Sequence, residues 1–450
     1  MAHSCKIGED LLVKILSSLP PKSLMRFKCA SKWWYALINN PRFVGNQLSN
    51  CLHNNQSIFL KRLVPNKDPN ASETESVFSV LSETESVFSV LTFCEDADGG
   101  AHSFLLSRVE DINVPVSMSV MSGGEELRIV GHCHGIICVN VDNYSKVFLW
   151  NPAIQEFKLL PSEKYFTDWE SLYQQRAPYL PLDYRLERAM GFGYDPISKT
   201  YKVVNIIFYG SQRHAHTLYS VVIYPLRVQV YTLGSSEESS SWREIKTYSL
   251  ETETTFLWPE RFQIHLKGMC YWLGSEQQKE YVDEEEMPYE EKIRQVMVSF
   301  DMSDEVFDEV ALPDELLDHD TTFFGLFLRL TVWNESSIAL CVWHYSYDVS
   351  PYFGMWLMDD DFGACVWTKH AGFELASIPM MDLREGGWAL ALWNSDELLV
   401  VDKDGCTICY NFRTENRMSL PTIQICMSNL DPPIVYVNSI VSIGLGRQQT

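Results

Sequence analysis

The chain has 450 residues, 46% of them hydrophobic, and its 59 acidic and 36 basic residues give a net charge of -23. This length favours two or three domains or one large repeat fold, and the hydrophobic share supports globular cores rather than disorder. The acidic balance excludes nucleic acid as the ligand of the main body, because phosphate binding depends on Lys and Arg.

Targeting signals are absent from the sequence. No apolar run reaches the ~20 residues of a membrane helix, and the N-terminus has no secretory pattern. We therefore expect no membrane association, reduced cysteines and a cytoplasmic location, with the nucleus as an alternative.

The first fifty residues differ in charge from the rest. They hold seven Lys/Arg against Glu9 and Asp10, a net of +5, which leaves -28 for the remaining 400 residues. A basic head on an acidic body predicts two surfaces with two different partners.

The same fifty residues have the apolar spacing of short helices. One stripe consists of Leu11, Leu12, Ile15, Leu16 and Leu19. Pro20-Pro21 ends that helix and Pro21 can open a second, Ser31 is a candidate N-cap for a third, and a short fourth follows Pro41. So small a unit cannot bury all its apolar side chains internally. They pack on the rest of the chain or dock another protein.

The run "GEDLLVKILSSLPPKSLMRFKCASKWWYALINNPRF" resembles the plant F-box, although Ile7-Gly8 stands where Leu-Pro is common. The resemblance implies a module that binds the adaptor Skp1 and, through it, the cullin 1 and RING subunits of an SCF-type ubiquitin ligase. The positions carried over as Skp1-binding are Leu11, Ile15, Leu19, Pro20, Leu24, Phe27 and Trp34. How they divide between the module's own core and the adaptor stays open. The positive charge suits the acidic adaptors of this family.

From about residue 130 the pattern is that of β-strands separated by turns. Six phrases read as hairpins, each with an aromatic anchor: 147–161, 192–204, 228–245, 297–313, 354–370 and 407–421. Their spacing predicts a five- or six-bladed, kelch-like β-propeller, with a β-sandwich as the alternative. We thus expect a small all-α domain at 1–50, a linker with the first strands at 51–130, and a large all-β domain at 131–450.

The phrases "HGIICV", "LWNPAIQEFKLLP", "GFGYDPISKTYKVV" and "GMCYWL" resemble the domain that follows the F-box in many plant proteins. With the terminal "IVYVNSIVSI", the wording is most similar to S-locus F-box and F-box-like proteins. That resemblance implies a substrate receptor whose client is a pistil S-ribonuclease, a basic protein, bound for ubiquitination. The alternatives are an unrelated client, or a propeller that binds a glycan or small molecule.

Acidic residues supply a candidate client-binding surface. Residues 280–320 contain sixteen Asp/Glu against two basic residues. A basic client would be attracted to them, whereas the alternative is a solvated insertion that only maintains solubility. The candidate residues are Asp283, Glu284, Glu285, Glu286, Glu290, Glu291, Asp359, Asp360 and Asp361.

Residues 72–91 repeat one decapeptide twice. Because ten is an even number, either copy can occupy the same strand with the same side chains on each face. We expect one copy to pair in a sheet and the other to form a bulge or loop.

Chemical motifs are missing. His132, Cys133, His134 and Cys138 lie too close along one strand to converge on a metal, and Cys406 and Cys409 form a single pair without a second. Phosphate loops, dinucleotide fingerprints and nucleophile elbows do not occur. We therefore expect no metal, no cofactor and no catalysis.

Overall fold

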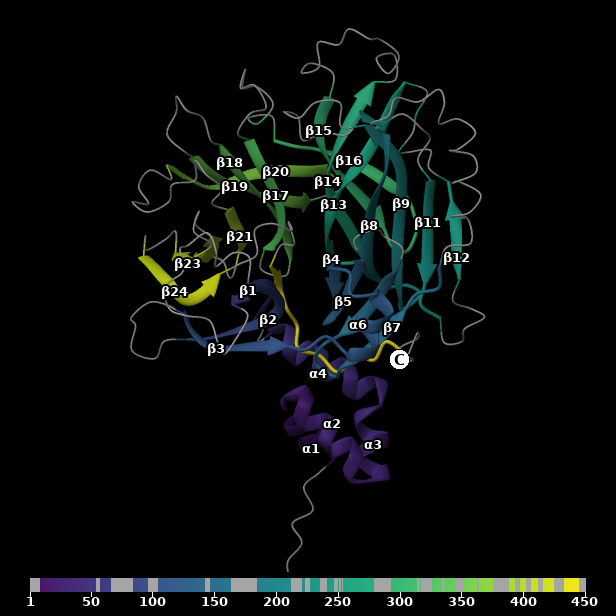
Figure 1. The fold of residues 1–450 in the computed structure, drawn as a ribbon, viewed down its shortest axis with the longest axis vertical. Coiled ribbons are helices and arrows are strands. Elements are labelled where there is room, and N and C mark those ends of the chain that lie inside the picture. The colour runs from purple at the N-terminus through teal and green to yellow at the C-terminus, as the bar shows by residue number, and fades with distance from the viewer. Residues whose placement is uncertain are drawn as a thin grey trace, which may run out of the picture.

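Four N-terminal helices stand beside a large β body in the computed structural model of the chain (Figure 1). The structure describes residues 9–53, 57–65, 84–95, 104–141, 146–162, 184–211, 221–222, 227–234, 241–246, 250, 252, 254–278, 293–313, 316, 326–333, 336–344, 352–361, 364–374, 388–392, 397–401, 406–411, 416–424 and 433–444. None of the helices within these ranges has the length and apolar character needed to span a bilayer.

The helical domain consists of α1 (Glu9–Ser17), α2 (Pro21–Ala30), α3 (Lys32–Ile38) and α4 (Pro41–His53). The predicted boundaries are found in the structure: Pro21 begins α2, and the Ser31 hydroxyl accepts a hydrogen bond from the Trp34 N–H at 3.3 Å. The last helix is longer than the short one predicted. It crosses the boundary expected at residue 50 and leads directly to the first strand.

The strands form six antiparallel sheets arranged as the blades of a propeller (Figure 1). The first sheet contains β25 (Ile434–Val435), β1 (Ser57–Pro65), β2 (Thr84–Glu95) and β3 (Phe104–Ile112), and the second contains β4 (Leu127–Cys133), β5 (Ile136–Val141), β6 (Val147–Asn151) and β7 (Glu156–Leu159). The third contains β8 (Tyr184–Asp195), β9 (Thr200–Ser211), β10 (Val221–Val222), β11 (Arg227–Thr232) and β12 (Trp242–Ile245).

The chain continues through three further sheets in the same way. The fourth contains β13 (Thr255–Leu266), β14 (Met269–Gln278), β15 (Ile293–Asp301) and β16 (Phe307–Ala311), and the fifth β17 (Leu326–Trp333), β18 (Ser337–His344), β19 (Tyr352–Asp361) and β20 (Ala364–Glu374). The sixth contains β21 (Trp388–Leu392), β22 (Glu397–Val401), β23 (Cys406–Asn411) and β24 (Asn416–Gln424). This confirms the predicted β-propeller over the sandwich.

The six predicted hairpins are all present. Five of them join the third and fourth strands of a sheet, as in β6–β7 and β15–β16, and their aromatic anchors are buried: Trp150, Tyr231, Phe300, Trp356 and Tyr410. The phrase at 192–204 is different, because it joins β8 and β9, the first two strands of the third sheet.

The region predicted as a linker with first strands holds most of one blade. Strands β1, β2 and β3 pair in order, and β25 from the C-terminal part of the chain adds to β1 and closes the ring. The short helix α6 (Val116–Ser122) then leads to β4. In the duplicated stretch the second decapeptide, from Thr84 onward, pairs in β2. The first decapeptide lies outside the described residues.

The two ends of the strands differ in their connections. At one end most hairpins turn in two to five residues, as at 134–135, 196–199, 267–268 and 302–306. We call this the short-turn end. Hydrogen bonds tie its turns together across blades, from Lys202 Nζ to the Met302 carbonyl at 2.5 Å and from Lys267 Nζ to the Ser336 carbonyl at 2.8 Å.

The opposite end, the long-connection end, carries most of the longer segments between strands. They include residues 160–183, 279–292, 312–325 and 375–387. Because Met269 follows the turn at 267–268 and the ten residues of β14 end at Gln278, the segment 279–292 starts and finishes at this end.

Candidate functional site

The surface of the helical domain is unusually apolar. Leu11 and Ile15, one turn apart on α1, are 55% and 48% exposed. Pro20 and Phe27 are exposed as well. Four of the seven residues predicted to bind the adaptor therefore present side chains to solvent, where a partner can cover them.

An aromatic ladder extends this surface over α2 and α3. The ring of Phe27 stacks on Trp34 with centroids 5.4 Å apart, and Trp34 meets Trp33 edge to face at 5.0 Å. Trp33 is 49% exposed and Tyr35 is 59% exposed. Sequence reasoning did not place these two residues at the site, although a second Trp beside a predicted interface Trp was an available signal.

The remaining predicted residues belong to the core. Leu24 is fully buried, and Leu19 and Trp34 pack partly buried against the same cluster as Leu16 and Ile38. Leu24 thus holds α2 in place and is not available to a partner. Leu24 is thus the fully buried one of the seven, and the assignment of the others to the adaptor stays a prediction.

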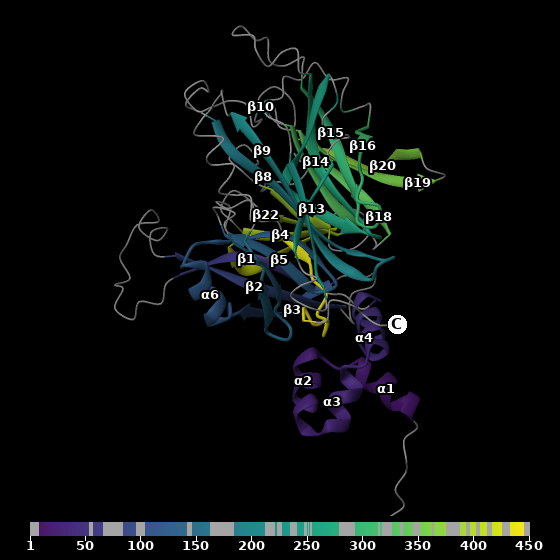
Figure 2. The same ribbon diagram turned by 90° about the vertical axis from the view of Figure 1, so that its right-hand side faces the viewer.

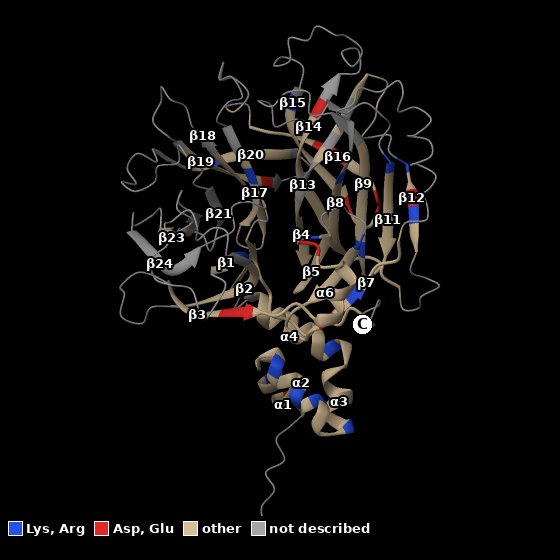
Figure 3. Cartoon of the chain, in the orientation of Figure 1, with Lys and Arg blue, Asp and Glu red and all other residues tan. Residues whose placement is uncertain are grey.

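The four helices also carry exposed basic side chains. Lys14, Arg26, Lys32 and Arg42 are all exposed on the four helices (Figure 3). Lys28 is different: burial lowers the pKa of its ammonium group, while the charge of Glu156 opposes that shift. Basic exposed side chains favour a partner with an acidic surface.

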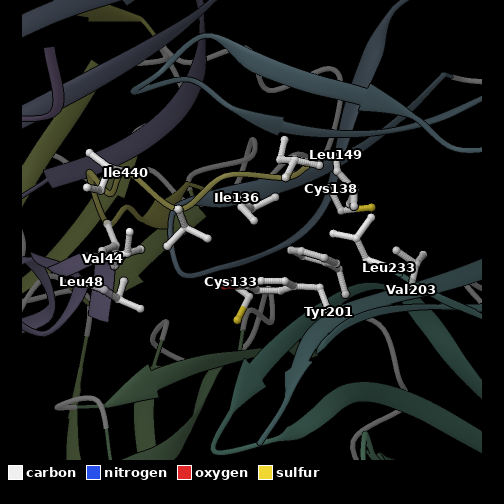
Figure 4. Close-up of a cluster of buried hydrophobic side chains, with 14 of the residues drawn as sticks. Val44, Leu48, Cys133, Ile136, Cys138, Leu149, Tyr201, Val203, Leu233 and Ile440 are labelled. Carbon is white, nitrogen blue, oxygen red and sulfur yellow. The ribbon is translucent and has the colours of Figure 1, made fainter. Parts of the chain in front are cut away.

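The helical domain and the propeller share one hydrophobic cluster. Val44 and Leu48 of α4 lie next to Ile440, and the cluster continues through Ile136 to Tyr201 in the third blade (Figure 4). Leu24, Ile38 and Phe43 belong to the same cluster. The exposed surface of the helices is consequently attached to the propeller through packed side chains.

The predicted acidic residues fall into two separate groups. Residues Asp283, Glu284, Glu285, Glu286, Glu290 and Glu291 lie outside the described residues, in the segment that begins and ends at the long-connection end. Asp359, Asp360 and Asp361 end β19 and pair with the start of β20. That end of β19 lies beside the β17–β18 turn, at the short-turn end. The structure therefore describes the position of the second group alone.

Of the His and Cys residues for which the sequence predicted no metal site, Cys133 and Cys138 are buried and His132 and His134 are partly buried. Burial, with the neighbouring His134, lowers the pKa of His132 to about 4, and burial lowers that of His134 to about 4. Burial also raises the pKa of the Cys133 and Cys138 thiols. Across the described ranges, no group of three or more His, Cys, Asp or Glu side chains is placed to hold a metal ion.

One buried charge network lies between the third and fourth blades. Lys202 Nζ is 2.8 Å from Asp195 and 2.9 Å from Glu305, and Arg243 also pairs with Glu305. Burial alone would raise the pKa of Asp195, but hydrogen bonds from Lys202, Ser198 and Ser303 hold it well below its usual range. The network joins turns of two blades, which is a structural role.

Comparisons with known proteins agree with this architecture. Residues 104–443 match the F-box associated beta propeller domain, and residues 9–44 match the F-box-like family. Among curated relatives, the chain is 26% identical to the putative F-box protein At1g47790 of Arabidopsis thaliana, over 69% of the chain and 60% of that protein. It is 25% identical to the Arabidopsis F-box/kelch-repeat protein At3g23880, over 68% of the chain and 65% of that protein.

Another Arabidopsis relative, the putative F-box protein At1g71320, is 22% identical over 86% of the chain and 87% of its own length. The chain spans about 41% to 65% of the length of the first three relatives. Among solved structures, the SapL1 lectin in complex with alpha methyl fucoside aligns with 83% of the chain and 99% of its own, at 11% identity and a TM-score of 0.32. A score this low supports no conclusion about ligands.

Proposed function

Because the chain belongs to the family of proteins with an F-box associated β-propeller, we propose that it is the substrate-recognition subunit of an SCF-type ubiquitin ligase. One observation carries the proposal: an exposed apolar surface on a basic F-box is joined to the propeller by a common core. The F-box binds a Skp1-like adaptor and, through it, cullin 1 and the RING subunit. The receptor accelerates ubiquitin transfer by holding client lysines close to the conjugating enzyme, a proximity effect.

The adaptor contacts in this proposal are Leu11, Ile15, Phe27 and Trp33. Their exposure leaves apolar area to be buried on binding, at roughly 25 cal/mol per Å² of apolar surface. Leu24 supports them from within the core and does not touch the adaptor.

The test is copurification of the full chain with a Skp1-like adaptor and cullin 1. We expect Ile15→Asp to reduce adaptor retention at least tenfold, since it places a charge in an apolar interface. Ile197→Asp is the matched control, because Ile197 is 78% exposed on a propeller turn far along the chain from the F-box. Equal retention by the two variants would remove α1 from the interface.

We further propose that the client binds at the long-connection end and is a basic protein, an S-ribonuclease of the pistil. Two features support this: the wording of the sequence is most similar to S-locus F-box proteins, and the acidic segment 280–292 leaves and re-enters the propeller at that end. Opposite charge speeds encounter, and salt weakens the effect.

The client proposal is tested by mixing the full chain with purified S-ribonuclease at two salt concentrations. Binding that weakens as salt rises is the expected result. Absence of binding at both concentrations overturns the client assignment and leaves the adaptor assignment intact, because the two surfaces are separate.

A further inference from the structure

The chain crosses from the propeller back to the F-box after its last strand. Strand β25 pairs with β1 and closes the ring of blades. Residues 436–444, which we call the C-terminal strap, then run beside α4 (Figure 2). Ring closure needs only β25, so the course of the strap calls for a separate explanation.

Blade two holds the strap by its backbone. The side-chain amide of Asn151 donates to the carbonyls of Ser439 and Val441 at 3.2 and 2.8 Å. The carboxylate of Glu156 accepts from the Ser442 hydroxyl at 2.8 Å and from the Gly444 N–H at 2.9 Å. Three of these four contacts are to the backbone of the strap and one is to the Ser442 side chain, and together they fix its path.

A glycine makes the close approach possible. Gly135, in the turn between β4 and β5, has a φ of +83°, and a Cβ there would lie 2.4 Å from the Val437 carbonyl oxygen. The Ser439 hydroxyl donates to the carbonyl of His134 at 2.5 Å. The strap therefore lies directly on this turn.

Two side chains of α4 hydrogen-bond the other side of the strap: Gln47, and Cys51, whose thiol donates to the Asn438 carbonyl at 3.2 Å. Gln47 of α4 is completely buried. Its amide nitrogen donates to the Asn438 carbonyl at 3.3 Å, and its oxygen accepts from the Ile440 N–H at 3.2 Å. A residue of α4 thus pairs with the strap as a neighbouring strand would.

Apolar contacts flank this pair of hydrogen bonds. Ile440, Val441 and Ile443 are each 1% exposed, and they share a cluster with Val44 and Leu48 of α4. An exposed ion pair between Lys22 of α2 and Glu110 of β3 adds a second connection between the F-box and the propeller.

We propose that the C-terminal strap fixes the orientation of the propeller relative to the F-box, and that Gln47 is its positioning residue. The strap is held rigidly by blade two on one side and by α4 on the other. The functional consequence of this orientation rests on the proposed function: a client bound on the propeller would be held at one distance and in one direction from the adaptor.

The direct test measures the distance between spin labels at Lys32 on α3 and Ile197 on the propeller. Both positions are exposed. The labels are attached to noncanonical residues, because Cys29 and Cys365 are exposed cysteines that would also react. The unaltered chain should give one narrow distance distribution.

Gln47→Leu keeps the buried volume but leaves the Ile440 N–H without its acceptor and the Asn438 carbonyl with only the Cys51 thiol as donor. We expect the width of the distance distribution to at least double. Asn46→Leu, at the exposed neighbouring position of the same helix, should leave it unchanged. A Gln47→Leu distribution as narrow as that of the unaltered chain overturns the proposal.

A second variant guards against misfolding of the first. Glu156→Ala releases the end of the strap from blade two without opening the core, since Glu156 is partly exposed. We expect the distribution of label distances to broaden for this variant too, while its circular dichroism spectrum stays unchanged. Narrow distributions in a folded Glu156→Ala protein would also count against the strap.

A reconstituted ubiquitination reaction supplies the functional readout. With adaptor, cullin, RING and conjugating enzyme present, mass spectrometry identifies which lysines of the receptor itself become modified. In the Gln47→Leu protein, at least twice as many propeller lysines should carry ubiquitin as in the Asn46→Leu protein. Both proteins should retain the same amount of adaptor. An unchanged set of modified lysines contradicts the positioning role. Failure of the unaltered chain to retain adaptor contradicts the proposed function instead, and the label distances still decide the inference.

Discussion

At the short-turn end of the propeller the chain reverses within a few residues, while at the long-connection end it leaves the sheets for segments such as 160–183 and 279–292. The short turns adopt left-handed backbone at His134, Gln155, Lys199, Lys267 and Glu305. Side chains also hydrogen-bond from one turn to the next blade at this end. The conformation of the short-turn end is therefore fixed by its turns and hydrogen bonds. The strap and the F-box pack against this end.

One ion pair from each end illustrates the same contrast. At the short-turn end, the side chains of Lys202 and Asp195 are 7% and 2% exposed. Near the long-connection end, Arg294 pairs with Glu276 and Glu309 while 45% exposed. Buried pairs are costly to break, whereas exposed pairs contribute little. Variation is therefore tolerated far better at the end where we place the client.

The largest expected effect comes from breaking the buried pair. Asp195→Ala leaves the Lys202 ammonium with Glu305 alone and removes the acceptor for the Ser198 and Ser303 hydroxyls. We expect the free energy of unfolding to fall by about 3–5 kcal/mol. Urea unfolding followed by fluorescence measures the change.

The matched control acts on the exposed triad at the other end. Glu276→Gln removes one partner of Arg294, which keeps Glu309 at 2.5 Å. The expected loss is at most about 1 kcal/mol. Comparable losses for Asp195→Ala and Glu276→Gln would contradict the difference between the two ends.

The second largest expected effect is a loss of folding stability in acid that arises from a histidine at the short-turn end. Burial is the main cause that lowers the pKa of His265, to about 3, and its Nε2 accepts from the Tyr194 N–H at 3.2 Å. The unfolded chain protonates this histidine near its ordinary pKa of about 6.5. Stability is thus fully present above that pH and is lost as pH falls toward 3.

The expected slope for this one histidine is up to about 1.4 kcal/mol per pH unit below pH 6.5. His265→Gln can still accept from the Tyr194 N–H but cannot titrate. Its unfolding free energy should therefore fall less steeply with acid than that of the unaltered chain. Parallel curves would show that His265 does not titrate differently in the folded state.

The outer strands of the blades could be predicted from the sequence because their apolar residues alternate and their turns carry familiar residues. Most of the innermost strands could not, β8 in the hairpin predicted at 192–204 being the exception. Gly131 in β4 faces Gln263 of β13, and Gly191 in β8 faces Trp272, so a small residue on one strand makes room for a large one on another. Such pairs join segments far apart in the chain and leave no local pattern.

The candidate site was predicted in outline for a similar reason. Helical spacing identifies Leu24 and Ile15 alike as apolar, and only packing shows that Leu24 is buried while Ile15 is half exposed. The contact between Gln47 and Ile440 spans 393 residues of sequence. A lone Gln in an amphipathic helix gives no sign of such a role.

A smaller expected effect is on the rate of client association, and it should differ between the two acidic groups. Replacing Asp283, Glu284, Glu285 and Glu286 by their amides should slow association with a basic ribonuclease about tenfold at low salt, with stability unchanged. The same change at Asp359, Asp360 and Asp361 should have less effect, because β19 ends at the short-turn end. Stopped-flow association rates at two salt concentrations provide the measurement. Equal slowing by both sets would place the client across both ends.

The smallest expected effect follows from deleting residues 72–81, the first decapeptide. The second copy already pairs with β1 from Thr84 to Thr92, and Phe93 after it is 2% exposed. In a strand built from the first copy, Glu83 would take the place of Phe93, so the sequence after the repeat favours the second copy.

Deletion shortens the connection between β1 and β2 from 18 to 8 residues. Loop-closure entropy then predicts stabilisation of about 0.7 kcal/mol, with the fold retained. Chemical unfolding compares the deleted and full chains. Because this connection leaves β1 at the end remote from α4, adaptor retention should stay equal. A loss of several kcal/mol would mean that the first copy contributes to the blade, and that the long-connection end is less tolerant than the comparison of the two ends implies.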